Sequence, residues 1–163
     1  METRIGFDEA RRGAGAPTQR DLAQALVRVM ADTYVLYFQT QSFHWNVRGP
    51  NFHSLHEMFE EQYEELAEAV DELAERMRAM GLMAPTSLGE IIGLGRAPRH
   101  HGAPRASEMV ATLLEAHELL ARDAHRTASL ADDLGDGVTH DLLIERAEKH
   151  EKTAWMLRAT LED

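Results

Sequence analysis

The chain is organised around a long helical pattern that begins after a turn at residues 48–51 and continues to Met80, just before Gly81. Asn51 or Ser54 is suited to cap its start, and the glycine is suited to end it. The stretch is dense in Asp and Glu and contains neither Pro nor Gly. It therefore predicts one long helix with an acidic surface.

Two pairs of polar residues repeat along this helix at helical spacing. His56 and Glu60 are four residues apart, and so are Asp71 and Glu75, so each pair shares one face. Glu60 and Asp71 are separated by about 1100° of helical rotation, which places them within about 20° of the same face. The same separation is a rise of about 16 Å. The two pairs therefore cannot hold one ion, or a close pair of ions, within a single chain.

A second copy of the helix can bring the two ligand pairs together. If two copies pack antiparallel across a two-fold axis near residues 65 and 66, His56 and Glu60 of one face Asp71 and Glu75 of the other. A two-fold contact is self-complementary, so it creates two equivalent sites. His44 precedes the turn, where the end of the preceding helix can bring it alongside His56. Imidazole and carboxylate ligands suit iron, manganese or zinc, so the spacing predicts an inter-subunit metal site.

The segments before and after this helix also read as helices. Thr18 with Asp21 matches a capping box, and apolar residues at helical spacing predict a helix from about 19 to about 46. Residues 81–106 are rich in Gly and Pro and form a long connection, in which Ser87 to Leu94 is expected to form a short helix. A connection of this length lets the helices on either side of it run parallel, as in ferritin-type bundles.

Two further helices complete the pattern, one capped by Ser107 and one starting at Thr139. No strand pattern is present, so the predicted fold is an all-α, ferritin-like four-helix bundle with a long crossover containing a short extra helix. The expected inner faces of the last two helices are Val110, Leu113, Leu114, His117, Leu120, Ala121 and Leu130, then Leu142, Leu143, Ala147, Trp155, Met156 and Leu161.

Composition narrows the function. The 163 residues carry a net charge of −11 and no cysteine, which excludes disulfides and thiolate ligands and disfavours nucleic-acid binding by the folded body. No apolar run reaches the roughly 20 residues that span a bilayer. The N-terminus has no apolar core like that of a secretory signal, so a cytoplasmic location without membrane contact is expected. Residues 1–17 are expected to be a mobile extension, and 18–163 one helical domain.

The other histidines offer alternatives to this site. His53 competes with His56 but lies in an exposed first turn, and the adjacent pair in the crossover is suited only to adventitious metal binding. His117 is expected in the core, and His140 and His150 on the surface. The zinc-protease motif lacks its second histidine, and no histidine has Glu three residues before it, which disfavours a site inside one bundle.

Three segments carry a resemblance to a known family. The stretch FHWNVRGPNFHSLHEMFEE, the later DELAERMRAMG and the closing KTAWMLR at 152–158 resemble the Dps family, the ferritin-like DNA-protection proteins of starved cells. The resemblance extends from about residue 18 to the end of the chain. It implies that His44, His56 and Glu60 bind iron together with Asp71 and Glu75 of the two-fold mate. The family usually has Asp where this chain has Glu60, and it places the indole of Trp45 beside the iron to absorb an oxidising equivalent.

The activity implied by the resemblance is that of a ferroxidase. It oxidises Fe(II), preferably with hydrogen peroxide, and stores ferric mineral inside a shell of twelve subunits, built from two-fold dimers. Glu118, Asp123 and the acidic residues of 132–136 are candidates for the iron-entry pores. Two alternatives stay open: a DNA-binding, nucleoid-compacting cage with little ferroxidase activity, and a plain helical assembly with vestigial ligands. Because the N-terminal extension has Arg but no Lys, any DNA contact is expected to be weak or made by that extension.

Overall fold

The computed structural model describes residues 15–162, and this part of the chain contains five helices and no strand. No helix in the described range is both long and apolar enough to cross a membrane. The helices are α1 (Gln19–Asn46), α2 (Phe52–Ala79), α3 (Leu88–Leu94), α4 (Ala106–Asp133) and α5 (Gly137–Thr160). Nearly all of the predicted N-terminal extension, residues 1–14, lies outside the described residues.

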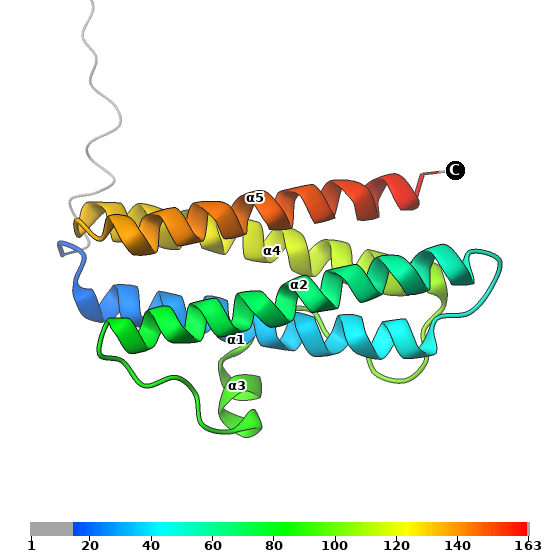
Figure 1. The fold of residues 1–163 in the computed structure, drawn as a ribbon, viewed down its shortest axis with the longest axis horizontal. Helices are drawn as coiled ribbons and strands as arrows, with labels where there is room; N and C mark the ends of the chain where they lie inside the picture. Colours follow the sequence, from blue (N-terminus) through cyan, green and yellow to red (C-terminus); the bar gives the residue numbers. More distant parts are fainter. Residues whose placement is uncertain (1–14, 163) are drawn as a thin grey trace, which may run out of the picture.

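The four long helices form two antiparallel pairs, α1 with α2 and α4 with α5 (Figure 1). The crossover returns the chain to the end at which α2 began, so α2 and α4 run in the same direction, as expected (Figure 1). The short α3 packs against α1. The predicted all-α bundle with a helix in its crossover is confirmed. Its core consists mainly of aliphatic residues with two phenylalanines, among them Leu26, Leu36, Phe43, Phe59, Leu66, Leu73, Leu113, Leu120 and Leu143.

The helix ends follow the sequence signals at some positions and depart from them at others. The capping box of Thr18 is present, and the Ser87 hydroxyl accepts a hydrogen bond from the Glu90 amide at the start of α3. Helix α4, however, begins one residue before Ser107, where the side chain of Glu108 accepts a hydrogen bond from the Arg105 amide. Helix α5 also begins before its predicted start, because the Asp136 carboxylate caps it by accepting from the Thr139 amide.

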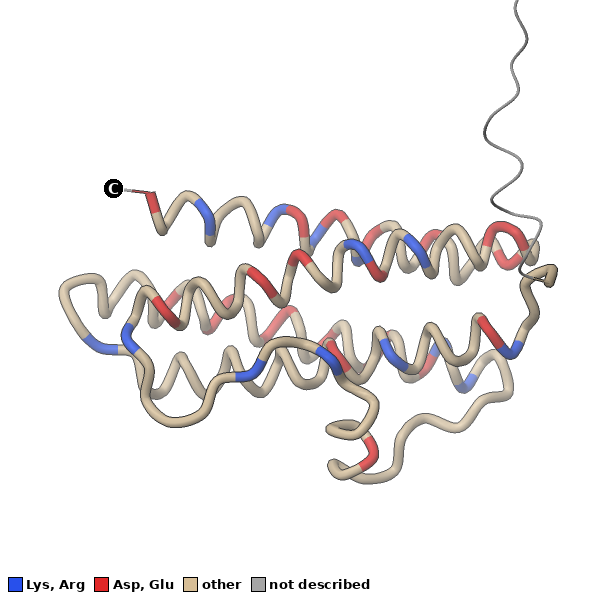
Figure 2. Tube along the Cα trace, turned by 180° about the vertical axis from the view of Figure 1, so that it is seen from behind, with Lys and Arg blue, Asp and Glu red and all other residues tan. Residues whose placement is uncertain are grey.

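The crossover is anchored to the bundle by a buried carboxylate. Asp32 of α1 is fully buried, and its Oδ1 accepts hydrogen bonds from the backbone amides of Arg96 and Ala97. Burial raises the pKa of this carboxyl against the opposing effect of those hydrogen bonds. The Arg96 guanidinium bridges to Asp123 of α4 at 2.5 Å. Figure 2 shows the basic positions along the crossover and the acidic ones spread over the long helices.

Helix α5 presents a different face from the one predicted. Trp155 and Leu161 were expected inside, but they are 62% and 37% exposed. His150, expected on the surface, is buried at 1%. The predictions for these three residues are wrong, because α5 carries apolar residues on more than one side and the periodic pattern did not single out the face that meets α4.

Candidate metal centre

Two histidines meet where α1 ends and α2 begins. His44 lies in the last turn of α1 and His56 in the second turn of α2, and the two rings stack with centroids 3.8 Å apart. The Nδ1 of His44 lies 2.8 Å from the carbonyl oxygen of His56, and the Nδ1 of His56 lies 2.9 Å from that of His44. The expected proximity of these two side chains is therefore confirmed.

The reciprocal hydrogen bonds decide where the ring protons lie. A carbonyl oxygen only accepts, so each Nδ1 carries the hydrogen and each Nε2 of the neutral ring keeps its lone pair. Histidine ligands of metals are commonly oriented in this way, by an outer hydrogen bond from the other ring nitrogen. His44 is buried and His56 is half-buried, so the pair is held in place while its edge remains accessible. The local arrangement suits two Nε2 ligands for a metal ion.

A carboxylate and a phenol extend the site along α2. Glu60 lies one turn beyond His56 and is half-buried. The Tyr63 ring meets His44 edge to face, with centroids 5.2 Å apart. Desolvation, and then the charges of Glu60 and Glu64, raise the pKa of the Tyr63 phenol, so it stays protonated beside the acidic helix.

Sequence reasoning missed two aromatic contributors. Tyr63 contacts His44, and Phe52 stacks on His56 with ring centroids 5.1 Å apart. Phe52 precedes His56 by four residues and Tyr63 follows it by seven, so helical spacing from His56 was the signal that could have found both.

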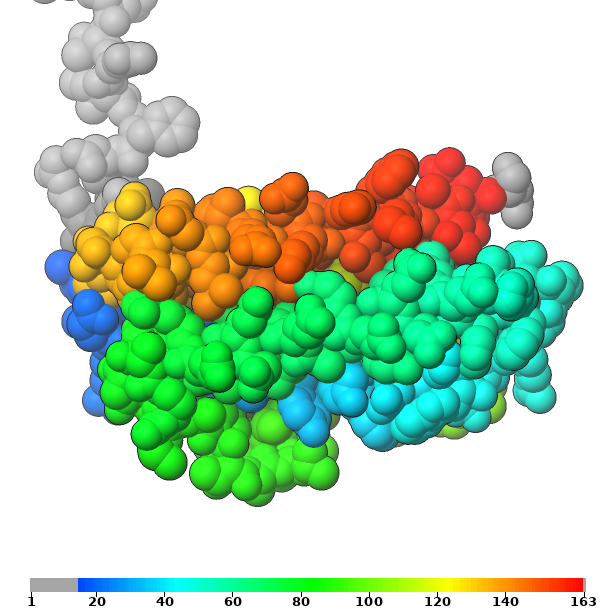
Figure 3. Space-filling model, viewed as in Figure 1, coloured from blue at the N-terminus to red at the C-terminus, as the bar shows by residue number. Residues whose placement is uncertain are grey.

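The remaining predicted ligands are apart from this group. Asp71 and Glu75 are exposed on α2, on the face that also carries Glu64 and Ala67. Figure 3 shows α2 open along the face viewed, bordered by α5 on one side and by α1 and α3 on the other. Within residues 15–162 of one chain, no three His, Asp or Glu side chains are grouped so as to hold a metal ion. One chain thus brings His44 and His56 together and leaves the two carboxylates outside.

Other predicted site residues have clear positions. Trp45 follows His44 directly and is 60% exposed. His53 is exposed and lies 3.2 Å from Glu57, one turn on along α2. Among the pore candidates, Asp123 is buried within the chain and bound to Arg96. Glu118 is bound by Arg158 at 2.7 Å.

Comparison with known proteins identifies the family to which this fold belongs. The family model of the ferritin-like domain matches residues 23–163 of this chain. A DNA protection during starvation protein of Brevibacillus brevis is 36% identical over 144 residues, covering 88% of this chain and 97% of that protein. The crystal structure of Dps from Staphylococcus aureus superimposes with a TM-score of 0.87 at 32% identity, over 91% of this chain and 99% of that one.

A third relative bears on the chemistry of the class. The crystal structure of the Dps protein from Vibrio cholerae, described as a member of a broad superfamily of ferritin-like diiron-carboxylate proteins, matches with a TM-score of 0.84. It is 29% identical over 91% of this chain and 99% of that one. The chain described here therefore belongs to the ferritin-like proteins and, among them, to the Dps family.

Proposed function

We propose that this protein is a ferroxidase whose iron site is shared by two subunits. His44, His56 and Glu60 of one subunit bind Fe(II) together with Asp71 and Glu75 of the partner subunit. The observation that carries the proposal is the pair of reciprocal hydrogen bonds that leaves both imidazole Nε2 atoms unprotonated at one accessible edge. Neutral imidazole and carboxylate ligands together suit Fe(II).

The spacing along α2 supports the two-fold arrangement. His56 and Glu75 are equidistant from the point between residues 65 and 66, and so are Glu60 and Asp71. Two antiparallel copies that cross at this point bring each imidazole opposite a carboxylate. Ala67 is exposed near the crossing point, where a small side chain lets two helices approach closely.

The surface of α1 and α3 also supports self-association. An apolar groove of about 710 Å³ lies between these two helices. Phe38, Leu88 and Ile92, which line it, are 58%, 61% and 53% exposed. Contiguous apolar surface of this kind commonly marks a protein–protein interface. We infer a two-fold dimer that buries this groove and the outer face of α2, and a dodecameric cage built from six such dimers.

The proposed reaction uses Fe(II) as its substrate and hydrogen peroxide as its preferred oxidant. Two Fe(II) ions give up one electron each, the O–O bond takes both electrons, and two protons complete two water molecules. Since no single electron is left on an oxygen atom, no hydroxyl radical is released. The ferric product is stored in the cage as mineral. If iron supplies only one of the two electrons that peroxide needs, the exposed indole of Trp45, next to His44, is placed to supply the other.

DNA protection follows from this chemistry, because it consumes Fe(II) and peroxide together. Protection of DNA is also named in the description of the relative from Brevibacillus brevis. The second candidate, a cage that binds and compacts DNA directly, depends on residues 1–14, which lie outside the described residues. The net charge of −11 weighs against DNA contact by the helical body. A cytoplasmic, nucleoid-associated location stays a prediction.

The sharing of the site between subunits provides its own test. His56→Ala and Asp71→Ala are each expected to abolish peroxide-dependent Fe(II) oxidation, followed by the absorbance of the ferric product. When the two variants are unfolded together and reassembled, every mixed dimer regains one intact site. Random mixing then restores about a quarter of wild-type activity, because half of the dimers are mixed and each has one of its two sites.

A site contained in one subunit gives a different result, because mixing then restores nothing. His53→Ala serves as the matched control, since this exposed histidine is predicted to lie outside the site and its loss should leave the rate unchanged. Removal of residues 1–14 tests the second candidate, the DNA-binding cage, separately from iron oxidation. DNA retention in a gel that is lost on this truncation, together with unchanged iron oxidation, assigns any DNA contact to the N-terminal segment.

A further inference from the structure

A second histidine pair lies inside the bundle, away from the candidate metal centre. His117 of α4 and His150 of α5 are 2% and 1% exposed, and their Nδ1 atoms are 2.9 Å apart. Burial lowers the pKa of His117 to about 3, and burial followed by the charges of His117 and Arg146 holds the pKa of His150 well below its usual range. Both rings are therefore neutral at physiological pH, with one N–H each.

Arg146 determines which nitrogen of each ring carries the proton. Its buried guanidinium binds Glu65 and places Nη2 3.5 Å from the Nε2 of His150. A guanidinium only donates, so this Nε2 presents its lone pair and the proton of His150 lies on Nδ1. That Nδ1–H donates to the Nδ1 of His117. The proton of His117 is therefore on its Nε2.

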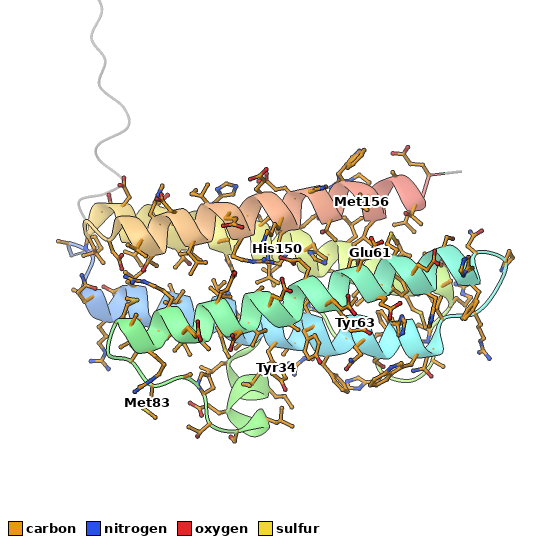
Figure 4. All side chains as sticks on the ribbon, in the orientation of Figure 1. Tyr34, Glu61, Tyr63, Met83, His150 and Met156 are labelled. Atoms are coloured by element: carbon orange, nitrogen blue, oxygen red, sulfur yellow. The ribbon has the colours of Figure 1, made fainter. Side chains whose placement is uncertain are left out.

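His117 lines a cavity, and its buried Nε2–H has no acceptor among residues 15–162. Neither this nitrogen nor the amide oxygen and nitrogen of Gln62, which is 8% exposed, has a hydrogen-bond partner among residues 15–162. Both side chains line a cavity of about 370 Å³ bordered by α2 and α5. Figure 4 labels Glu61 and Met156 on these two helices. Buried donors without partners are costly, so a site of this kind is expected to hold a polar occupant.

The positive charges at the cavity indicate the sign of that occupant. The chain has only two lysines, and both of them, Lys149 and Lys152, line this cavity. Of the lining carboxylates, Glu65 is already bound by Arg146 and has Lys149 at 3.5 Å, so its charge is compensated. Lys149 also bridges Glu145 at 3.1 Å, so Lys152 is the lysine of the lining without an ion pair among residues 15–162. In a protein of net charge −11, the two lysines make the charge of this cavity lining balanced, since they offset Glu61 and Glu65.

We propose that this cavity is a binding site for a small oxyanion of the phosphate type, held by His117, Lys149 and Lys152. The ammonium groups supply charge, and the imidazole N–H and the Gln62 amide supply directed donors. Since one water occupies about 30 Å³ in the liquid, a cavity of 370 Å³ holds such an ion together with several waters. A cation fits less well, because the Nε2 of His117 has no lone pair to offer it.

Among the carboxylates that line the cavity, Glu61 is the one with no ion pair to a cation of residues 15–162. It is exposed, so solvent screens its repulsion. Its removal has opposite consequences for the two kinds of occupant. Glu61→Gln strengthens the binding of an anion and weakens that of a cation, which makes this substitution the discriminating variant.

Equilibrium dialysis of the full-length assembled protein with radiolabelled inorganic phosphate, at constant ionic strength, tests the site. We expect saturable binding of one phosphate per chain. Lys152→Gln should weaken it by about threefold or more, and Glu61→Gln should strengthen it by about twofold to threefold. Arg122→Gln is the matched control, because Arg122 is an exposed cation of α4 outside the cavity lining, and its removal should change nothing.

Chemical labelling gives a second readout that does not depend on any substitution. Because Lys149 and Lys152 are the only lysines, phosphate should protect both from an amine-reactive reagent, as quantified by peptide mass spectrometry. Absence of saturable phosphate binding, or equal weakening by Lys152→Gln and Arg122→Gln, overturns the proposal. Manganese binding that is lost in Glu61→Gln, without phosphate binding in the wild type, assigns the cavity to a cation instead.

Discussion

Two histidine pairs of the long helices differ in what they present to their surroundings. In the pair His44 and His56, each Nδ1 donates to a backbone carbonyl, and the Nε2 lone pairs are left for a ligand. In the pair His117 and His150, the Nδ1–H of His150 donates to the Nδ1 of His117 and Arg146 closes the other end of His150, so His117 presents its Nε2–H. Histidine thus offers lone pairs to a cation in the first pair and a hydrogen-bond donor in the second.

The fixed hydrogen-bond partner of one ring nitrogen therefore decides what the other ring nitrogen can bind. A carbonyl can only accept and a guanidinium can only donate, so each forces the opposite tautomer on the ring nitrogen that it meets. Location reinforces the difference. The first pair lies at the junction of two helices and is partly accessible, whereas the second is buried between α4 and α5, where His117 also lines the cavity that contains the two lysines.

The largest expected effect comes from replacing one histidine of each pair by leucine. His44→Leu should lower the rate of peroxide-dependent Fe(II) oxidation by about 100-fold or more, since even the loss of an outer partner of a metal ligand costs about 10- to 100-fold. His150→Leu, in contrast, should leave the rate within about twofold while lowering stability, because the Nδ1 of His117 loses its donor. Stopped-flow absorbance and urea unfolding measure the two effects. Equal losses of activity in both variants would remove the functional distinction between the pairs.

A substitution of Arg146 tests the buried histidine pair through the free energy of unfolding. Arg146→Met leaves Glu65 without its buried partner and frees the end of the His150 ring. Breaking a buried ion pair costs about 3–5 kcal/mol, and we expect the lower end because Glu65 is one-third exposed and keeps Lys149. Urea unfolding measures the loss. The double variant with Glu65→Met should recover much of it, and no recovery would contradict the assignment of the cost to the unpaired carboxylate.

The pH dependence of stability separates the buried pair from the accessible one. A histidine whose pKa is lower in the folded protein binds its proton only after unfolding, so stability decreases as the pH falls below about 6.5. For His117 the decrease continues to about pH 3, at about 1.4 kcal/mol per pH unit. Urea midpoints at pH 7.5, 6 and 5 should therefore fall less steeply in His150→Leu than in the wild type. Identical slopes would show that His150 is not held neutral.

The smallest effect is expected from the aromatic neighbour of the accessible pair. Phe52 stacks on His56 and is 44% exposed, so it orients the ring without binding a ligand. Phe52→Leu should slow Fe(II) oxidation by about twofold to fivefold, in line with the 0.5–1.5 kcal/mol that an aromatic contact contributes. Initial rates across Fe(II) concentrations measure it. A control variant, Ile144→Ala, shortens an exposed apolar side chain of α5 that belongs to neither histidine site, and it should leave these rates unchanged.

Much of the fold was predictable because its signals are local. The capping box of Thr18, the bounds of α1 and the short α3 after Ser87 follow from hydrogen bonds between residues three or four apart. The meeting of His44 and His56 was also predictable, since a tight turn joins the ends of two antiparallel helices. The proposed role of Asp71 and Glu75 rests on the periodicity of a single helix.

Other features depend on contacts between distant segments. His150 was predicted on the surface and is buried, and Trp155 was predicted inside and is exposed, because the orientation of α5 about its axis is set by packing against α4. Asp123 was a pore candidate and binds Arg96 of the crossover. These partners lie 27 to 33 residues apart, too far for helical spacing to relate them.

The helices, their order and the symmetric spacing of potential ligands along α2 can be read from the residues alone, because each of these follows from the helical repeat. Contacts between helices set which nitrogen of each histidine is free, which lysines share a cavity with His117, and which face of α5 is hidden. Those features depend on the position of single atoms from different helices, and such positions are set by packing of the whole bundle.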